Sequence, residues 1–393
     1  MKQAKRLDNA PPYLFVEIEN KIKEAQKKGI DVINLGIGDP DIATPDFIVQ
    51  KMTEAVTNPT YHCYPEYDGC EEFLQSIAAY FKKRFGIELD PANEIVGLMG
   101  SKEGIAHIFF ALVNDGDFTL VPDPQYPVYK LATLLTGGIP YPMPLTPENN
   151  YLPDLSVIPE EVIKRTKILF VNYPNNPTGA IADLEFYKKI VQFGKKHDIL
   201  ICNDNAYIDF TYDGKVAPSI LEVEGALETA IEFHSFSKSF NMTGWRLGYA
   251  VGNSDAIAKL KKMKNNIDSG IFTAIQMAGV EALEKGQLFP PKMLDIYTKR
   301  KDLVLDYLDK LKWEYTKPQG AFYVWVKVPQ PNTSASFAQY LLDSFGVVVA
   351  PGNGYGDYGE GYFRISLTIS DERIKEAFQR IMKQSKNRAN KKK

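Results

Sequence analysis

Four short runs of largely apolar residues recur through the middle of the chain, at residues 118–121, 168–171, 199–202 and 230–233. They lack the regular alternation of polar and apolar residues that marks a strand with one face in water. Nearly continuous apolar runs of this length are typical of parallel strands with both faces buried. The pattern therefore predicts a mainly parallel sheet at the centre of the fold.

Between and around these runs, apolar residues recur at the spacing of an α-helix. Phe186, Ile190 and Phe193 recur at helical spacing within residues 183–197, which predicts a strand, helix, strand crossover. The same periodicity predicts a helix at 71–84, ended by Gly86, and a longer helix at 293–311 that would connect two domains. These elements together predict an α/β fold.

The pattern changes after residue 311, where residues 320–326 and 362–367 have the composition of strands and a helix begins near Asp371. A chain of 393 residues is too long for one ordinary hydrophobic core. We expect an N-terminal arm with part of a small domain at 1–46, a large domain at 47–290 and a small C-terminal domain at 291–393.

Charge and cysteine usage narrow the classes of function. A net charge of -3 gives no reason to expect a nucleic-acid or membrane partner. The three cysteines have no CxxC spacing, so we expect neither disulfides nor a metal site. The chain opens without an apolar leader, and no run approaches the roughly 20 apolar residues that cross a bilayer. We expect a cytoplasmic protein acting on small molecules, with the basic run at 386–393 as a solvated end without function.

Polar side chains gather after the four predicted strands, at the edge where open parallel sheets bind ligands. Tyr126 and Asn176 lie in Pro-rich turns after the first two strands, Asp204 and Tyr207 follow the third, and Lys238 follows the fourth. Each has an ordinary explanation alone, as a cap, turn former, core residue or solvated lysine. Together they match pyridoxal 5′-phosphate (PLP), whose aldehyde needs an amine, whose pyridine nitrogen needs an acid and whose phenolate oxygen needs a donor.

A cradle for the cofactor phosphate is predicted at residues 100–104, Gly-Ser-Lys-Glu-Gly, which open an apolar helical stretch. Backbone N–H groups at a helix N-terminus attract anions. Ser101 would cap this helix, bind the phosphate, or do both, with Lys102 beside it. Arg246, shortly after Lys238, would add a bidentate charge-assisted contact.

Residues 235–249, Ser-Phe-Ser-Lys-Ser-Phe-Asn-Met-Thr-Gly-Trp-Arg-Leu-Gly-Tyr, resemble the lysine motif of the class I fold-type I aminotransferases, the family of aspartate aminotransferase. The resemblance extends over nearly the whole chain. It implies a large domain with a mainly parallel seven-stranded sheet between helices, a smaller α+β domain, and PLP as cofactor. It also implies a homodimer with shared active sites, because the family places a tyrosine, here Tyr64, in the neighbouring subunit's phosphate site.

The resemblance assigns a role to each candidate residue. Lys238 is the lysine that forms the Schiff base, and the proposed catalytic set is Lys238, Asp204 and Tyr207. The implied cofactor-binding residues are Ser101, Lys102, Tyr126, Asn176, Asp204, Tyr207, Ser235, Lys238, Arg246 and Tyr64. Arg364 would pair with the substrate α-carboxylate beside Gly38, and the remaining implied substrate contacts are Tyr126, Asn176 and Tyr13.

Within the family the chain is most similar to the LL-diaminopimelate aminotransferases, through residues 11–15, 36–41, 100–104 and 268–272. This implies ping-pong transfer of an amino group to 2-oxoglutarate in lysine biosynthesis. Tyr13, Tyr67 and Lys130 are candidates for the distal end of the substrate, with packing or solvation as their ordinary role. A broader aspartate or aromatic aminotransferase and a PLP-dependent carbon–sulfur lyase stay as alternatives. A PLP-binding regulatory module and a dinucleotide-binding dehydrogenase are disfavoured, the latter because no GxGxxG follows a predicted strand.

Overall fold

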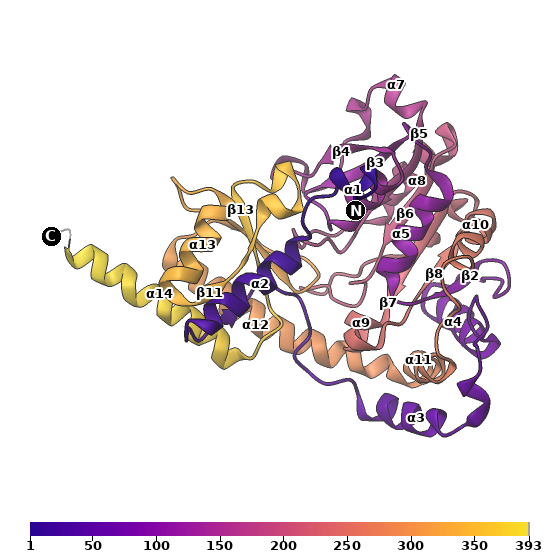
Figure 1. Ribbon diagram of the computed structural model, residues 1–393, viewed down its shortest axis with the longest axis horizontal. Coiled ribbons are helices and arrows are strands. Elements are labelled where there is room, and N and C mark those ends of the chain that lie inside the picture. Colours follow the sequence, from indigo (N-terminus) through magenta and orange to yellow (C-terminus); the bar gives the residue numbers. More distant parts are fainter. Residues whose placement is uncertain (392–393) are drawn as a thin grey trace.

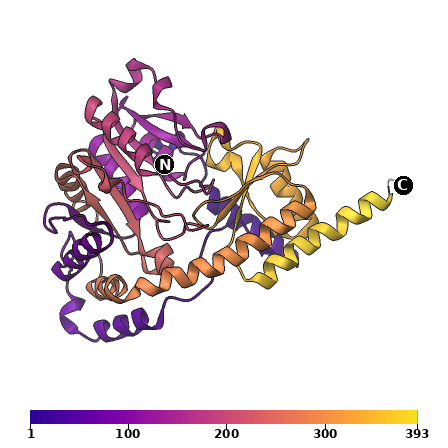
Figure 2. The ribbon, with the colours of Figure 1, turned by 180° about the vertical axis from the view of Figure 1, so that it is seen from behind.

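The computed structural model describes the backbone of residues 1–391 and the side chains of residues 1–383. The basic run at 386–393 therefore lies outside the side chains that are described. The strands of the chain lie in two groups, and the long helix α12 (Phe289–Leu311) connects them (Figures 1 and 2). Within the described residues, no helix is long and apolar enough to cross a membrane.

The larger group is a seven-stranded sheet in which six strands run in one direction and β8 runs in the opposite direction. This confirms the predicted mainly parallel sheet of an α/β fold. In spatial order the strands are β2 (Ile95–Leu98), β8 (Gly248–Gly252), β7 (Ala230–Ser235), β6 (Leu200–Asp204), β5 (Thr166–Val171), β3 (Phe118–Asp123) and β4 (Ile139–Pro144).

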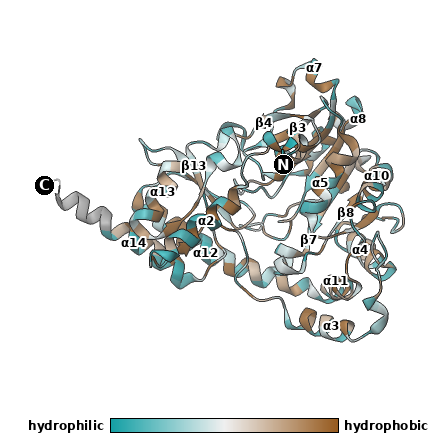
Figure 3. Cartoon of the chain, in the orientation of Figure 1, coloured by the Kyte–Doolittle hydropathy of each residue, from teal (hydrophilic) through white to brown (hydrophobic). Residues whose placement is uncertain are grey.

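Both faces of this sheet are covered, which explains why its strands read as continuous apolar runs. In β5, Ile168 and Phe170 face a core shared with α5 (Ser101–Leu112), α6 (Val128–Leu135) and α10 (Ser254–Lys264). Leu169 and Val171 face the opposite core, shared with α4 (Glu71–Phe85), α8 (Leu184–His197) and α11 (Thr273–Lys285). Hydrophobic residues are accordingly concentrated along the strands and on the inner sides of these helices (Figure 3).

The predicted helices are confirmed within a few residues at each end. The side chain of Asp183 accepts a hydrogen bond from Phe186 N at 2.8 Å and so caps α8, while Gly86 ends α4 in the left-handed conformation with φ 71°. The other α-helices are α1 (Lys5–Asp8), α2 (Leu14–Lys27), α3 (Asp46–Val56), α7 (Glu160–Ile163), α9 (Phe236–Ser239), α13 (Ser334–Phe345) and α14 (Asp371–Lys391).

The smaller group of strands is a four-stranded antiparallel sheet in the order β12 (Ala350–Pro351), β13 (Tyr362–Ser366), β10 (Tyr323–Lys327), β9 (Tyr315–Thr316). Beside it β1 (Ile33–Asn34) pairs in parallel with β11 (Val347–Val348), so the N-terminal segment joins this part of the chain.

The predicted strand at 320–326 begins three residues late, at Tyr323. Gly320 instead forms an isolated bridge with Thr211, and Ala321 has φ 56°, a left-handed conformation that an extended strand cannot contain. The local apolar pattern was correct, but the turn that docks residues 320–322 on the segment after β6 shortens the strand.

Candidate active site

A cavity of about 350 Å³ lies at the carboxyl ends of the central strands, where the sequence places its unusual polar residues. We call it the active-site cavity. Among the residues predicted from the sequence, it is lined by Gly38, Ser101, Lys102, Tyr126, Asn176, Asp204, Tyr207, Ser235, Lys238, Arg246 and Arg364. Its volume lies in the range of about 300–1,000 Å³ that small-molecule sites occupy.

Lys238 is held on α9, a single turn that follows β7 directly. The side chain of Ser235 caps this turn by accepting a hydrogen bond from Ser237 N at 3.2 Å. The Lys238 amine donates to the carbonyl oxygen of Gly38 at 2.9 Å. Burial lowers the pKa of Lys238 to about 8, although the negative charge of Asp39 acts to raise it. Roughly a tenth of this amine is therefore neutral, and hence nucleophilic, at pH 7.

Asp204 ends β6 with its carboxylate buried beneath the active-site cavity. Tyr129 donates its hydroxyl to Oδ2 at 2.8 Å, and the backbone N–H of Ala206 donates to Oδ1 at 3.3 Å. Burial raises the pKa of Asp204 to about 6, with the bond from Tyr129 acting in the opposite direction. The carboxylate is therefore mostly ionised at pH 7 and can pair with a cationic ring nitrogen.

Tyr207 and Tyr323 meet at the floor of the cavity, where their hydroxyl oxygens lie 2.9 Å apart. Burial raises the pKa of Tyr207 well above its usual range, so it is a neutral hydrogen-bond donor at physiological pH. Gly38 is needed beside this pair, because a Cβ at that position would lie 2.1 Å from the Tyr323 hydroxyl oxygen. Tyr323 was not identified from the sequence.

Arg364 is a buried cation, only 1% exposed, on strand β13. Its Nη1 donates to Oδ1 of Asn176 at 2.7 Å and its Nη2 donates to the carbonyl oxygen of Gly36 at 2.6 Å. The guanidinium lies 3.9 Å from the centre of the Tyr323 ring, and its Nε has no hydrogen-bond partner. Because both hydrogen-bond acceptors of this buried guanidinium are neutral, it is well suited to bind a carboxylate in the cavity.

The opposite end of the cavity has the features of an anion cradle. Helix α5 begins at Ser101 with its first N–H groups at the cavity, and Ser235 and Arg246 line the same end. Gly100 has φ 84°, and a Cβ there would lie 2.2 Å from Nη2 of Arg246. Glycine at this position therefore lets the guanidinium approach the start of α5.

Four predicted residues lie outside the active-site cavity. Tyr64 follows a short 3-10 helix and is 88% exposed, and Tyr67 is 49% exposed. Tyr13 reaches the edge of the cavity, with its hydroxyl 3.3 Å from that of Tyr126. Together with Lys130 it lines a neighbouring cavity of about 380 Å³. The single chain thus leaves the roles of Tyr64 and Tyr67 as predictions.

Several cavity residues were not identified from the sequence: Phe15, Ile37, Asp39, Asn172, Ala206, Ser237, Thr243 and Tyr323. Asp39 and Ile37 flank Gly38 in a segment that was already singled out, so their proximity was a usable signal. Phe15 likewise lies in the segment 11–15 that carries the resemblance, whereas Tyr323 comes from a predicted strand with no signal for the site, and only the fold brings it to the cavity.

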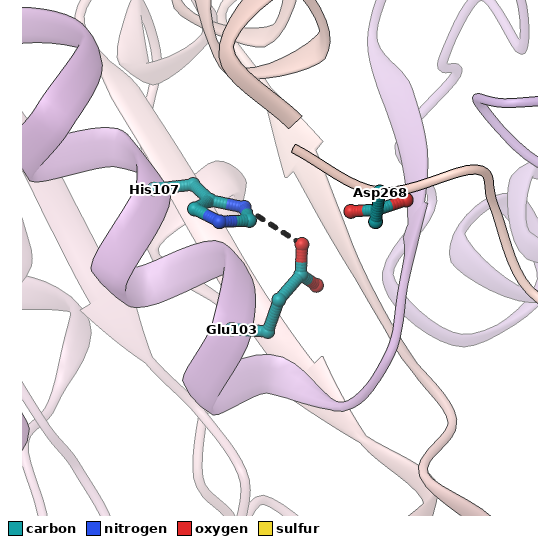
Figure 4. A group of neighbouring side chains, drawn as sticks. All are labelled: Glu103, His107 and Asp268. Atoms are coloured by element: carbon teal, nitrogen blue, oxygen red, sulfur yellow. Dashed lines mark ion pairs between the residues drawn. The ribbon is translucent and has the colours of Figure 1, made fainter. Parts of the chain in front are cut away.

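Glu103, His107 and Asp268 form a separate cluster between α5 and the segment before α11 (Figure 4). Glu103 Oε1 lies 2.7 Å from Nδ1 of His107, and Lys264 donates to Oδ1 of Asp268 at 2.7 Å. Lys264 thus already neutralises Asp268, while Glu103 and His107 pair with each other within α5.

Comparison with known proteins identifies relatives along the whole chain. Residues 30–381 match the family model for aminotransferases of class I and II. An LL-diaminopimelate aminotransferase from Moorella thermoacetica is 51% identical over 381 residues, covering 97% of this chain and 98% of the relative. One from Halothermothrix orenii is 52% identical with the same coverage.

Solved structures agree with these sequence matches. A substrate-bound structure of BacF from Bacillus subtilis superposes with a TM-score of 0.94 at 38% identity, over 98% of each chain. A mutant of Thermus thermophilus aspartate aminotransferase superposes with a TM-score of 0.91 at 28% identity, over 97% of this chain and 99% of that one. The predicted fold-type I architecture is therefore confirmed, and the chain belongs to the class I and II aminotransferase family and is an aminotransferase.

Proposed function

We propose that this aminotransferase transfers an amino group from LL-diaminopimelate to 2-oxoglutarate, in lysine biosynthesis, with PLP as cofactor. The observation that carries the choice of substrate is the identity of about half of all positions, along nearly the full length, to proteins of that name. Several relatives of this name share about half of their positions with this chain over 97% of its length, and this agreement favours the same donor.

The active-site cavity fits PLP in each of its chemical parts. The cradle of Ser101, Ser235 and Arg246 suits a phosphate, Asp204 suits the pyridine nitrogen, and the amine of Lys238 suits the aldehyde. When bound, PLP supplies a conjugated ring that withdraws electrons from the substrate Cα.

The protein's own side chains then supply orientation and proton transfer. Arg364 binds the α-carboxylate of the amino acid and so fixes which bond at Cα stands in line for reaction. Lys238 removes the Cα proton as a free amine, a task favoured by its lowered pKa. Tyr207 and Asn176 would supply hydrogen-bond donors for the cofactor phenolate oxygen, and Tyr126 would supply an aromatic surface for its ring.

Aminotransfer and β-elimination differ in their need for an acceptor. With LL-diaminopimelate as donor, we expect glutamate to form only when 2-oxoglutarate is present, at one glutamate per donor consumed. The measurement is an end-point assay of glutamate, ammonia and pyruvate with and without the oxoacid. Release of ammonia without 2-oxoglutarate, or of pyruvate from sulfur amino acids, would favour the carbon–sulfur lyase instead.

We further propose a cytoplasmic homodimer with two shared sites, divided into domains at about residues 46 and 290 as predicted from the sequence. Tyr64 supports the sharing, because its ring is 88% exposed in the single chain and needs a partner surface to become a ligand. The phosphate cradle of the partner subunit is the surface that the family resemblance implies.

Mixed dimers test the shared site. Tyr64→Phe and Lys238→Ala proteins, each impaired, should recover activity when mixed and allowed to exchange subunits, since some mixed dimers then carry one intact site. Random exchange of equal amounts would give up to about a quarter of the wild-type activity by this statistical argument. The control mixes each variant with itself under the same conditions. Absence of recovery, with exchange verified by differently tagged chains, would place Tyr64 outside the partner's site.

A further inference from the structure

A further large cavity lies away from both the active-site cavity and its neighbour, and the proposed reaction does not use it. Its volume is about 430 Å³, and it is enclosed by α4, the segment at residues 208–217 and the junction between α11 and α12. We call it the side cavity. Most of its wall is apolar, including Ile208, Val216, Phe240, Ala282, Leu283 and Leu294. Val216, in the lining of this cavity, is 80% exposed.

One edge of the side cavity carries charge. Lys83 and Arg84 at the end of α4 face Asp209, which leaves one net positive charge at this edge. The Nη1 group of Arg84 donates to Oδ1 of Asp209 at 2.5 Å and also contacts the hydroxyl of Tyr80. Within the described side chains, Nη2 and Nε of Arg84 make no hydrogen bond and Lys83 makes no ion pair. The free side of the guanidinium matches a planar carboxylate.

A physical connection leads from this charged edge to the catalytic lysine. The second oxygen of Asp209 accepts a hydrogen bond from the hydroxyl of Ser239, the residue that follows Lys238 on α9. A small cavity of about 20 Å³, lined by Asp209 and Ser235 among others, lies between the two larger cavities. It shares Asp209 with the side cavity and Ser235 with the active-site cavity.

The small cavity has both polar and apolar walls and has room for about one water molecule. Asn205 lines it with a fully buried side chain whose oxygen and nitrogen both lack a partner. Buried amides without partners are costly, so a bound water there would complete a polar bridge between the two larger cavities.

We propose that the side cavity binds a small organic acid with one carboxylate and an apolar body, and that this acid lowers the rate of transamination. The carboxylate pairs with the free donors of Arg84, and the body covers the apolar wall beside Val216. The bound acid draws the Arg84 guanidinium away from Asp209, which alters the contact from Asp209 to Ser239 and hence the position of α9.

Binding is tested with 3-phenylpropanoate as the probe and 3-phenylpropanamide as its uncharged match. Because the acid can also bind Arg364 in the active site, titration calorimetry is done on Arg364→Leu protein as well as on wild type. We expect the acid to bind in both backgrounds, at least tenfold more tightly than the amide. Loss of binding with Arg364→Leu would place the acid in the active site and overturn the proposal.

The variant Gln287→Glu probes the charge at the side cavity with an isosteric change. Gln287 lines the side cavity, is exposed and belongs to no catalytic or cofactor contact. The new carboxylate should weaken binding of the acid at least fivefold and leave binding of the amide unchanged, and Arg84→Gln should weaken the acid further. Equal affinities for acid and amide, or affinities unaffected by both variants, would contradict the assigned chemistry.

Two further measurements keep the proposal testable if a variant folds poorly. A crystal grown with 3-(4-bromophenyl)propanoate should show the bromine anomalous signal beside Val216, and a signal only at Arg364 would overturn the site. With saturating substrates, the acid should lower kcat at least twofold in wild type, and the same effect in Gln287→Glu should require at least fivefold more acid. Only this kinetic outcome rests on the proposed function, because the binding and crystal experiments need no substrate.

Discussion

Replacement of Lys238 by alanine should lower the rate of transamination by at least about 10³-fold, because the side chain serves both as the amine for the cofactor aldehyde and as the base at Cα. Among the side chains of residues 1–383, only Lys238 and Lys102 line the active-site cavity, and the Lys102 amine lies 4.0 Å from the centre of the Tyr13 ring at its edge. The measurement is single-turnover kinetics on protein saturated with PLP.

The variant Lys238→Arg is the matched control, because it keeps the charge and most of the side chain but has no amine that can condense with an aldehyde. It should be as inactive as the alanine variant. Borohydride reduction of wild-type protein with PLP, followed by peptide mapping, should place the modification on Lys238. An adduct on a different lysine would contradict this role.

Replacement of Asp204 by asparagine should lower kcat by about 10²-fold or more while PLP binding changes much less. The negative charge of Asp204 holds the ring nitrogen protonated, and asparagine keeps the shape of the side chain but removes the charge. Asp204→Ala should have the same kinetic effect, with an additional loss of stability of about 1–3 kcal/mol because the hydroxyl of Tyr129 loses its buried acceptor.

Tyr129→Phe is the control that separates the loss of the Tyr129 hydrogen bond from the loss of the Asp204 carboxylate. It removes the hydrogen bond to Asp204 and keeps the carboxylate, so we expect a loss in kcat below about tenfold. Absorbance titration separates PLP affinity from turnover in all three variants. Near-normal turnover of Asp204→Asn would mean that a different group protonates the ring.

The central sheet could be predicted from the sequence because its strands are buried on both faces, and both faces of β5 are indeed packed in separate cores. The strand at β10 was placed three residues too early, since the pattern of residues 320–326 cannot show that Ala321 takes a left-handed conformation. Hydrophobic patterning records burial, and burial alone does not fix where a chain turns.

The candidate site was predictable where it depends on strand ends, because parallel strands bring their carboxyl ends to one edge. Asp204 and Tyr207 lie at the end of β6, Lys238 follows β7, and all three meet in one cavity. Tyr323 and Phe15 reach the same cavity from segments that only the tertiary fold brings together. The hydrogen bond from Arg364 to Asn176, which are 188 positions apart in the sequence, likewise could not be predicted without the tertiary fold.

The central claim is tested most directly by comparing kcat/KM for amino donors with 2-oxoglutarate as acceptor. We expect LL-diaminopimelate to exceed aspartate, tyrosine and alanine by at least about 100-fold, because a site built to bind a distal amino-carboxylate leaves its polar groups unpaired with simpler donors. L-2-Aminopimelate, which lacks only the distal amine, is the matched control. Its kcat/KM should lie between that of LL-diaminopimelate and those of the three simpler donors. A larger kcat/KM for aspartate or tyrosine than for LL-diaminopimelate would contradict the proposed substrate.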